Sequence, residues 1–130
     1  MNNIKSPRTD DDGVEHEIIA KGKTAPRVTP VDIEENIVSE WYFTAAQGAD
    51  ASGEDCGMQP PVPASSPLHL LTFCVLVLRN GFTVTGESAC ASPENFDADI
   101  GRRIARSNAV QKVWPLMGYE LRTKLSKELA

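Results

Sequence analysis

The feature that most constrains the fold is a pair of β-type segments separated by Asn80-Gly81. The first is the apolar run "LHLLTFCVLVL" and the second is "FTVTGESAC". An Asn-Gly pair in this position predicts a β-hairpin with a two-residue type I′ turn at positive φ. Because the first segment is apolar almost throughout, we expect a central strand covered on both faces. Its start around His69 could instead be a helical turn.

A helical pattern precedes the hairpin. Thr29 and Pro30 are typical of a helix start, and the segment that follows is "TPVDIEENIVSEWYF". A helix over this segment places Ile33, Ile37 and Trp41 in one stripe, which we expect to be buried.

Two further helices are expected after the hairpin. The first is long and runs from about Pro93 to Trp114, where Pro115 should end it. The second is short, because Leu121, Leu125 and Leu129 recur four residues apart. The whole order predicts an α+β fold: an N-terminal helix, an antiparallel β-hairpin sheet, a long helix packed on it and a short C-terminal helix.

The expected domain organisation is simple. Residues 29–130 should form a single α+β domain, preceded by a polar tail at residues 1–28 that could contain a short strand over residues 14–20. Residues 45–67 are rich in Gly, Ala, Ser and Pro and are expected to be a flexible loop. Because two strands alone are marginal, we expect a further strand from residues 14–20 or from a second copy of the chain.

The distribution of charge along the sequence limits the classes of molecule that the protein is expected to bind. The net charge is −5 over 130 residues, but residues 29–60 carry seven acids and no Lys or Arg, whereas residues 91–130 carry seven basic and five acidic residues, a net of +2. The acidic first half argues against duplex DNA, and the positive C-terminal part suits a small anionic ligand. No apolar segment reaches membrane-spanning length, so we expect no membrane partner. Cys56, Cys74 and Cys90 are an odd number and are expected to be free thiols.

Small and apolar residues form two neighbouring rows on the long helix. A row of small residues lets another backbone come close, and we expect it to be the interface of a homo-oligomer. The small row is Gly101, Ala105 and Ala109, and the apolar ridge beside it is Phe96, Ile100 and Ile104.

The candidate binding residues lie on the same helix. Arg102, Arg103 and Arg106 are either a solvated face paired with acids or a clamp for phosphate oxygens. Asn108 is expected on the buried side, where its amide must bond a loop carbonyl, a neighbouring subunit or a ligand. Phe96 is either a core residue or a stacking platform for a base.

Catalytic patterns are weak. The two histidines have no metal-ligand spacing with the cysteines, and phosphate-binding and nucleophile motifs are missing from the sequence. We therefore expect a protein that is not an enzyme, with no cofactor and no metal.

Residues 29–121, apart from 45–67, resemble the gene product 49/66 family of small tailed-phage proteins. The resemblance is carried by "TPVDIEENIVSEWYFTA" and by the run from "LTFCVLVLRNGFTVTGESAC" to "ENFDADIGRRIARSNAVQKVWPLMGYEL". It implies a phage accessory protein acting in the host cytoplasm.

The arrangement "NGF…V.G.S…NFD..IG..IA..NA…W" is also similar to that of the Thoeris anti-defence sponge proteins. This second resemblance implies binding of a cyclic nucleotide immune signal, of cyclic ADP-ribose or cyclic oligonucleotide type, without degradation, in pockets between subunits of an oligomer. Phe96, Arg102, Arg103, Arg106 and Asn108 are then the ligand-binding candidates. The alternatives are a phage protein that inhibits a host protein, favoured by the acidic segment at 29–41, and an assembly accessory.

Overall fold

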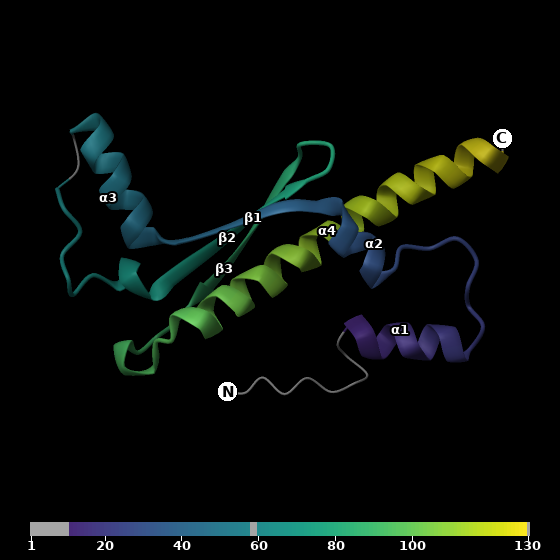
Figure 1. Ribbon diagram of the computed structural model, residues 1–130, viewed down its shortest axis with the longest axis horizontal. Coiled ribbons are helices and arrows are strands. Elements are labelled where there is room, and N and C mark those ends of the chain that lie inside the picture. The colour runs from purple at the N-terminus through teal and green to yellow at the C-terminus, as the bar shows by residue number, and fades with distance from the viewer. Residues whose placement is uncertain (1–10, 58–59, 130) are drawn as a thin grey trace. The chain divides into compact units, whose positions relative to one another are not determined.

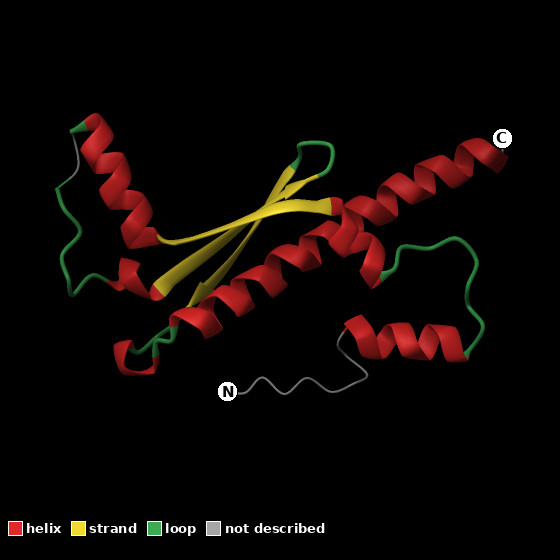
Figure 2. Ribbon diagram, viewed as in Figure 1, coloured by secondary structure: helices red, strands yellow, loops and turns green. Residues whose placement is uncertain are grey.

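The computed structural model describes residues 11–57 and 60–129. The described segments form helices and one antiparallel sheet, which confirms the predicted α+β class (Figures 1 and 2). The start of the expected tail, residues 1–10, lies outside the described residues. The elements are α1 (Asp11–Ala20), α2 (Pro30–Asn36), β1 (Ile37–Thr44), α3 (Ala45–Cys56), η1 (Pro67–Leu70), β2 (Leu71–Leu78), β3 (Thr83–Ala89), η2 (Pro93–Asn95) and α4 (Ala98–Leu129).

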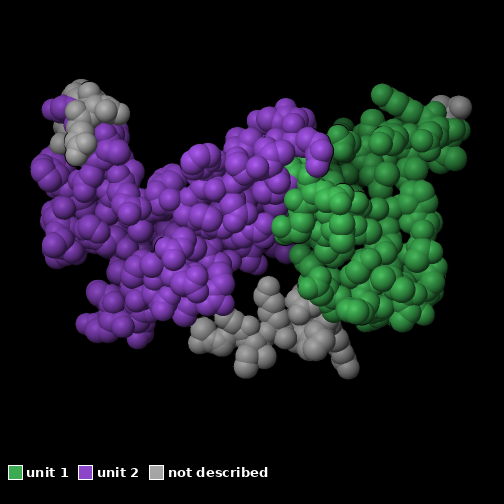
Figure 3. Space-filling model, viewed as in Figure 1, with its two compact units in different colours: residues 1–36, 114–130 green, residues 37–113 purple. Residues whose placement is uncertain are grey.

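These elements fall into two compact units, coloured separately in Figure 3. One unit is residues 37–113 and holds the sheet and the first half of α4. The other joins residues 1–36 to residues 114–130. A single domain over residues 29–130 stays a prediction, because compactness alone does not decide whether the units fold independently.

The N-terminal segment is helical rather than extended. Helix α1 covers residues 14–20, so the strand expected there is wrong. Asp11 opens the helix, where a negative charge complements the helix dipole, and its carboxylate accepts a 3.1 Å hydrogen bond from the Trp114 indole. Arg27 donates to both Glu15 carboxylate oxygens at 2.6 and 2.7 Å. These contacts join α1 to the segments around it within one compact unit.

The helix expected over 29–41 is only seven residues long, and β1 follows it directly. Ile33 is buried as predicted, at 1% exposure, but Trp41 is 61% exposed on β1. The predicted buried stripe of Ile33, Ile37 and Trp41 is therefore wrong. Residues 37–44 are mostly β-branched or aromatic, and such residues favour a strand once a pairing partner is present. Strand β1 is the third strand that the sheet needed.

The sheet has the order β1-β2-β3 with both pairs antiparallel. Strand β2 is central, as predicted, and the 3₁₀ turn η1 at its start confirms the helical-turn alternative around His69. Burial alternates along β2, so the expectation that both faces are covered is wrong. The buried face, which α4 covers, carries Thr72, Cys74, Leu76 and Leu78. We call the opposite side the outer face; its partly or fully exposed apolar residues are Trp41, Phe43, Phe73, Val75 and Val77.

The hairpin turn differs from the predicted one. Gly81 has φ 89°, which confirms positive φ there, but no described non-glycine residue has positive φ, so a type I′ turn is wrong. The Gly81 N–H donates to Leu78 O and the Leu78 N–H donates to Phe82 O, both at 2.8 Å. This is a three-residue loop in which a turn is followed by a left-handed glycine. The Asn80 side chain accepts from the Phe82 N–H at 2.9 Å and stabilises the loop.

Residues 45–67 contain a helix where we expected a flexible loop. Helix α3 begins with a capping box: the Thr44 hydroxyl accepts from the Gln47 N–H, and the Gln47 side chain accepts from the Thr44 N–H. The pair satisfies two backbone donors at the helix start. Gly57, at φ 65°, ends the helix in the left-handed conformation. The loop prediction for this part is wrong. It rested on the Gly, Ala, Ser and Pro content and did not take the Thr44–Gln47 capping box into account.

Helix α4 is a single helix of 32 residues and passes through Pro115. The expected stop at Pro115, with a separate short helix after it, is therefore wrong. Proline removes one backbone hydrogen bond and crowds the preceding turn, but it does not oblige a helix to end. The start is also later than predicted, because Pro93–Asn95 forms the 3₁₀ turn η2.

The small row of α4 packs inside the molecule. Ala105 and Ala109 are fully buried, and a methyl group built on Gly86 of β3 would overlap the Ala105 backbone carbonyl. The close approach that the row permits is therefore made to the sheet of the same chain. The predicted apolar ridge is not buried, since Ile100 and Ile104 are each more than a third exposed. The row consequently gives no support to an oligomer, which stays a prediction.

Candidate pocket beside the start of helix α4

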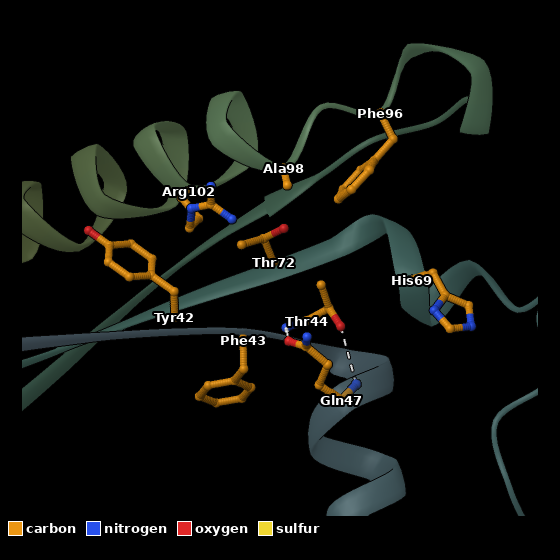
Figure 4. A pocket seen from close by; sticks show the side chains of 9 residues that line it. All are labelled: Tyr42, Phe43, Thr44, Gln47, His69, Thr72, Phe96, Ala98 and Arg102. Carbon is orange, nitrogen blue, oxygen red and sulfur yellow. Dashed lines mark hydrogen bonds between the residues drawn. The ribbon is translucent and has the colours of Figure 1, made fainter.

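A pocket of about 440 Å³ lies in the unit of residues 37–113. It is formed where the end of β1 and the start of β2 meet η1 and the start of α4 (Figure 4). Ring side chains and short polar side chains line it together. The lining residues are Tyr42, Phe43, Thr44, Gln47, His69, Thr72, Phe96, Ala98 and Arg102.

Two of the five predicted ligand-binding residues, Phe96 and Arg102, line this pocket. Phe96 is half-buried and lies between η2 and α4, where its N–H donates to Pro93 O at 3.2 Å. The Asp97 carboxylate then caps α4 by accepting from the Ile100 N–H at 3.0 Å. This short connection places the Phe96 ring against the cavity, six residues before Arg102 and just ahead of the start of α4.

Arg102 differs from the other two arginines. It forms no hydrogen bond or ion pair with any described residue, and it stands over the cavity in Figure 4. Arg103 pairs with Asp99 at 3.1 Å on the exposed surface of α4. The surface-pair alternative therefore describes Arg103, whereas the phosphate-clamp alternative stays open for Arg102.

Arg106 belongs to a polar chain behind the pocket wall. Its Nε donates to Glu40 at 2.9 Å, and the other Glu40 oxygen accepts from the Tyr42 hydroxyl at 3.0 Å. The guanidinium lowers the pKa of Glu40. Burial, followed by the bond to Glu40, raises the pKa of Tyr42. Arg106 does not line the pocket, but through Glu40 it helps to fix the position of Tyr42, which does.

Asn108 lies away from the pocket. It is exposed rather than buried, so the predicted burial is wrong. Its amide nitrogen donates to the Glu87 carbonyl of β3 at 2.8 Å. A backbone carbonyl was one of the partners that the sequence left open for this amide.

Thr72 is a pocket residue that sequence reasoning missed. It is 3% exposed. Among the buried side-chain oxygen and nitrogen atoms of the described residues, its hydroxyl oxygen is the one that has no hydrogen-bond partner. The hydroxyl lies beside Gly101 of α4, where a Cβ would come within 3.0 Å of it. The available signal was a single polar residue inside the apolar run of β2.

The remaining polar groups of the pocket are engaged by the protein. Thr44 and Gln47 form the cap of α3, and the His69 Nε2 lies 3.0 Å from the Pro63 carbonyl oxygen. Phe43 points away from the cavity and onto the outer face (Figure 4), where its ring contacts Phe73 at a centroid distance of 5.6 Å. No cluster of three or more potential metal ligands occurs in the described parts of the chain.

The fold and pocket define a small α+β protein whose described helices are all too short or too polar to cross a membrane. The chain belongs to the phage protein (N4 Gp49/phage Sf6 gene 66) family, whose sequence profile matches residues 28–125. No curated protein matches the sequence. No solved structure matches the fold.

Proposed function

We propose that this phage protein binds a cyclic nucleotide immune signal, of cyclic ADP-ribose or cyclic oligonucleotide type, and sequesters it in the host cytoplasm. The observation that carries the proposal is that Phe96, Tyr42 and Arg102, which has no partner in the described part of the chain, line one cavity. A nucleotide needs a surface for its base and a cation for its phosphates, and aromatic rings and guanidinium groups supply these. The similarity of "NFD..IG..IA..NA" to anti-defence sponge proteins supports the ligand class.

The proposal is capture without turnover. Hydrolysis of a phosphodiester needs a positioned base or a metal. His69, the imidazole at the pocket, is bonded to a backbone carbonyl, and the Thr44 hydroxyl is used by the α3 cap. Neither group is therefore placed as a free base, and we expect a ligand bound here to be recovered unchanged.

Calorimetry with cyclic ADP-ribose isomers and cyclic di- and trinucleotides tests this function. We expect one of them to bind to the wild type and to be released intact on heating, with its mass unchanged. Arg102→Ala should weaken binding roughly tenfold or more, because a charge-assisted bond contributes about 1.5–3 kcal/mol. Arg103→Ala is the matched control, since its partner is Asp99 on the exposed surface. Absence of binding by every compound would refute the proposal.

The second candidate is a protein-binding function, and the outer face favours it. Trp41 is 61% exposed and Phe43 39% exposed on that face, beside partly exposed residues of β2. Such a patch is typical of a surface that contacts another protein. The partner would be a second copy, as in the homo-oligomer that we propose, or a host protein that the phage inhibits.

Light scattering at micromolar concentration separates these partners. An oligomeric wild type that becomes monomeric on Trp41→Ser identifies a second copy. A monomeric wild type rules out the homo-oligomer. Capture of one host protein that is lost with Trp41→Ser would then favour the inhibitor.

A further inference from the structure

The α4 side of the pocket contains hydrogen-bond donors that have no partner among the described residues. Arg102 forms no hydrogen bond or ion pair with a described residue, and Thr72 carries the unpaired buried hydroxyl. The backbone at the start of α4 also borders the pocket, because Ala98, the first residue of the helix, is one of the lining residues. Figure 4 places these three residues together, whereas Gln47 and His69 lie farther from the helix.

The helix start adds backbone donors to this group. Of the first N–H groups of α4, that of Ile100 donates to the Asp97 carboxylate and that of Gly101 to the Asp97 carbonyl. The N–H groups of Ala98 and Asp99 have no acceptor among the described residues. Unbonded N–H groups and the positive end of the dipole make a helix start a site for an anion.

The buried hydroxyl of Thr72 is the independent observation. A buried hydroxyl without a partner destabilises the folded state, and such a group is rare in native proteins. The oxygen exposes less than 1 Å² of surface, so solvent does not satisfy it. The absence of a side chain at Gly101 leaves room beside the Thr72 hydroxyl, because a Cβ on Gly101 would lie only 3.0 Å from that oxygen. Thr72 also lines the cavity, so a ligand oxygen can bind the hydroxyl only if the side chain rotates about its Cα–Cβ bond.

We propose that Thr72, Arg102 and the first N–H groups of α4 form an oxyanion subsite, which takes one phosphate group of the ligand. This deepens the proposed function, because it assigns the anionic part of the ligand to the α4 side and leaves the rings of Tyr42 and Phe96 for the base. The nearby carboxylates do not oppose it: Asp97 caps the helix, Asp99 pairs with Arg103, and neither lines the cavity.

The test uses sodium phosphate and sodium pyrophosphate as probes, with sodium chloride at matched ionic strength. Amide resonances of Ala98 and Asp99 should shift in a saturable way with the probes and not with chloride. Thr72→Val and Arg102→Gln should each weaken the apparent affinity by roughly tenfold or more. Thr72→Ser should retain binding. Arg103→Gln is the control, because it removes the same positive charge as Arg102→Gln at a position outside the pocket.

Stability separates a ligand role from a structural one. Thr72→Val removes an unpaired buried hydroxyl at nearly constant shape, so its melting temperature should equal or exceed that of the wild type. Weaker phosphate binding by a variant that is no less stable supports the subsite. Unchanged phosphate binding by Thr72→Val, or saturable shifts confined to other residues, overturns it.

The outcomes also separate this inference from the proposed function. Phosphate binding that depends on Thr72, with no binding of any cyclic nucleotide, keeps the subsite and refutes the sequestration of a nucleotide. Nucleotide binding that Phe96→Ala weakens and Thr72→Val leaves unchanged keeps the function and refutes the subsite.

Discussion

Gly86 of β3 lies directly against the backbone of Ala105 in α4, with no room for a side chain between them. A Cβ on Gly86 would overlap the Ala105 carbonyl oxygen and would lie 2.9 Å from the Ala109 Cα. The sheet and the helix therefore touch through their main chains at this point. The first half of α4, with Arg102 on it, is positioned by that contact.

Gly86→Ala should destabilise the protein by about 1–3 kcal/mol or more, because backbone atoms cannot move aside as a flexible side chain does. Urea denaturation measures the change. Gly118→Ala is the matched control, since a Cβ at Gly118 meets nothing within 4 Å, and alanine is the better helix former. Equal stability of the two variants would contradict the close approach.

Gly81→Val should also destabilise, for a conformational rather than a packing reason. A Cβ at Gly81 meets nothing within 4 Å, but its φ of 89° is strained for a β-branched residue. We expect a loss of roughly 1–2 kcal/mol in thermal or chemical unfolding. Gly81→Asn should cost less, since asparagine tolerates positive φ. If both variants melt like the wild type, the turn is made elsewhere.

Low pH should weaken the hydrogen-bonded network of the Arg106, Glu40 and Tyr42 side chains. Arg106 lowers the pKa of Glu40 below its ordinary value of 4.5. A depressed folded-state pKa contributes stability that is present above the unfolded pKa and is lost as pH falls through the folded pKa. Melting temperatures of wild type and Glu40→Gln, measured from pH 7 to pH 3, should therefore converge below about pH 4.5. A constant difference across this range would contradict the assignment.

Pro115→Ala should stabilise the protein. Proline inside a helix costs about 3 kcal/mol relative to alanine, and Pro115 lies well within α4. We expect a higher melting temperature and slightly greater helicity by circular dichroism. Leu116→Ala serves as a control for a neighbouring, 40% exposed position. A less stable Pro115→Ala would mean that the irregularity at proline is needed for packing.

Local signals predicted part of this fold well. The apolar run before Asn80 identified the central strand, and Gly81 marked the turn. The error at β1 arose because Ile33, Ile37 and Trp41 satisfy a helical period while their neighbours favour a strand. Pairing with β2 decides between these two patterns, and a single segment carries no information about that pairing.

The candidate site was predictable only in part, because it depends on which charges meet. Arg102, Arg103 and Arg106 are chemically equivalent in the sequence, yet two of them face carboxylates and the third faces the cavity. Glu40, the partner of Arg106, is 66 residues away. Thr72 was missed for a related reason, since a polar residue in an apolar strand becomes informative only when its lack of a partner is visible.

The bond from Asn108 to Glu87 has a consequence for the behaviour of the chain in a crowded cell. Backbone bonds between Leu78 and Phe82 and between Leu70 and Cys90 flank the β2–β3 ladder, so Glu87 directs its carbonyl away from β2. An outward carbonyl on an edge strand is a template for another strand, and the Asn108 amide occupies it. The proposed stoichiometric capture would require the protein to accumulate to the level of its ligand, and the Asn108 bond removes one of the carbonyls through which copies could pair at that concentration.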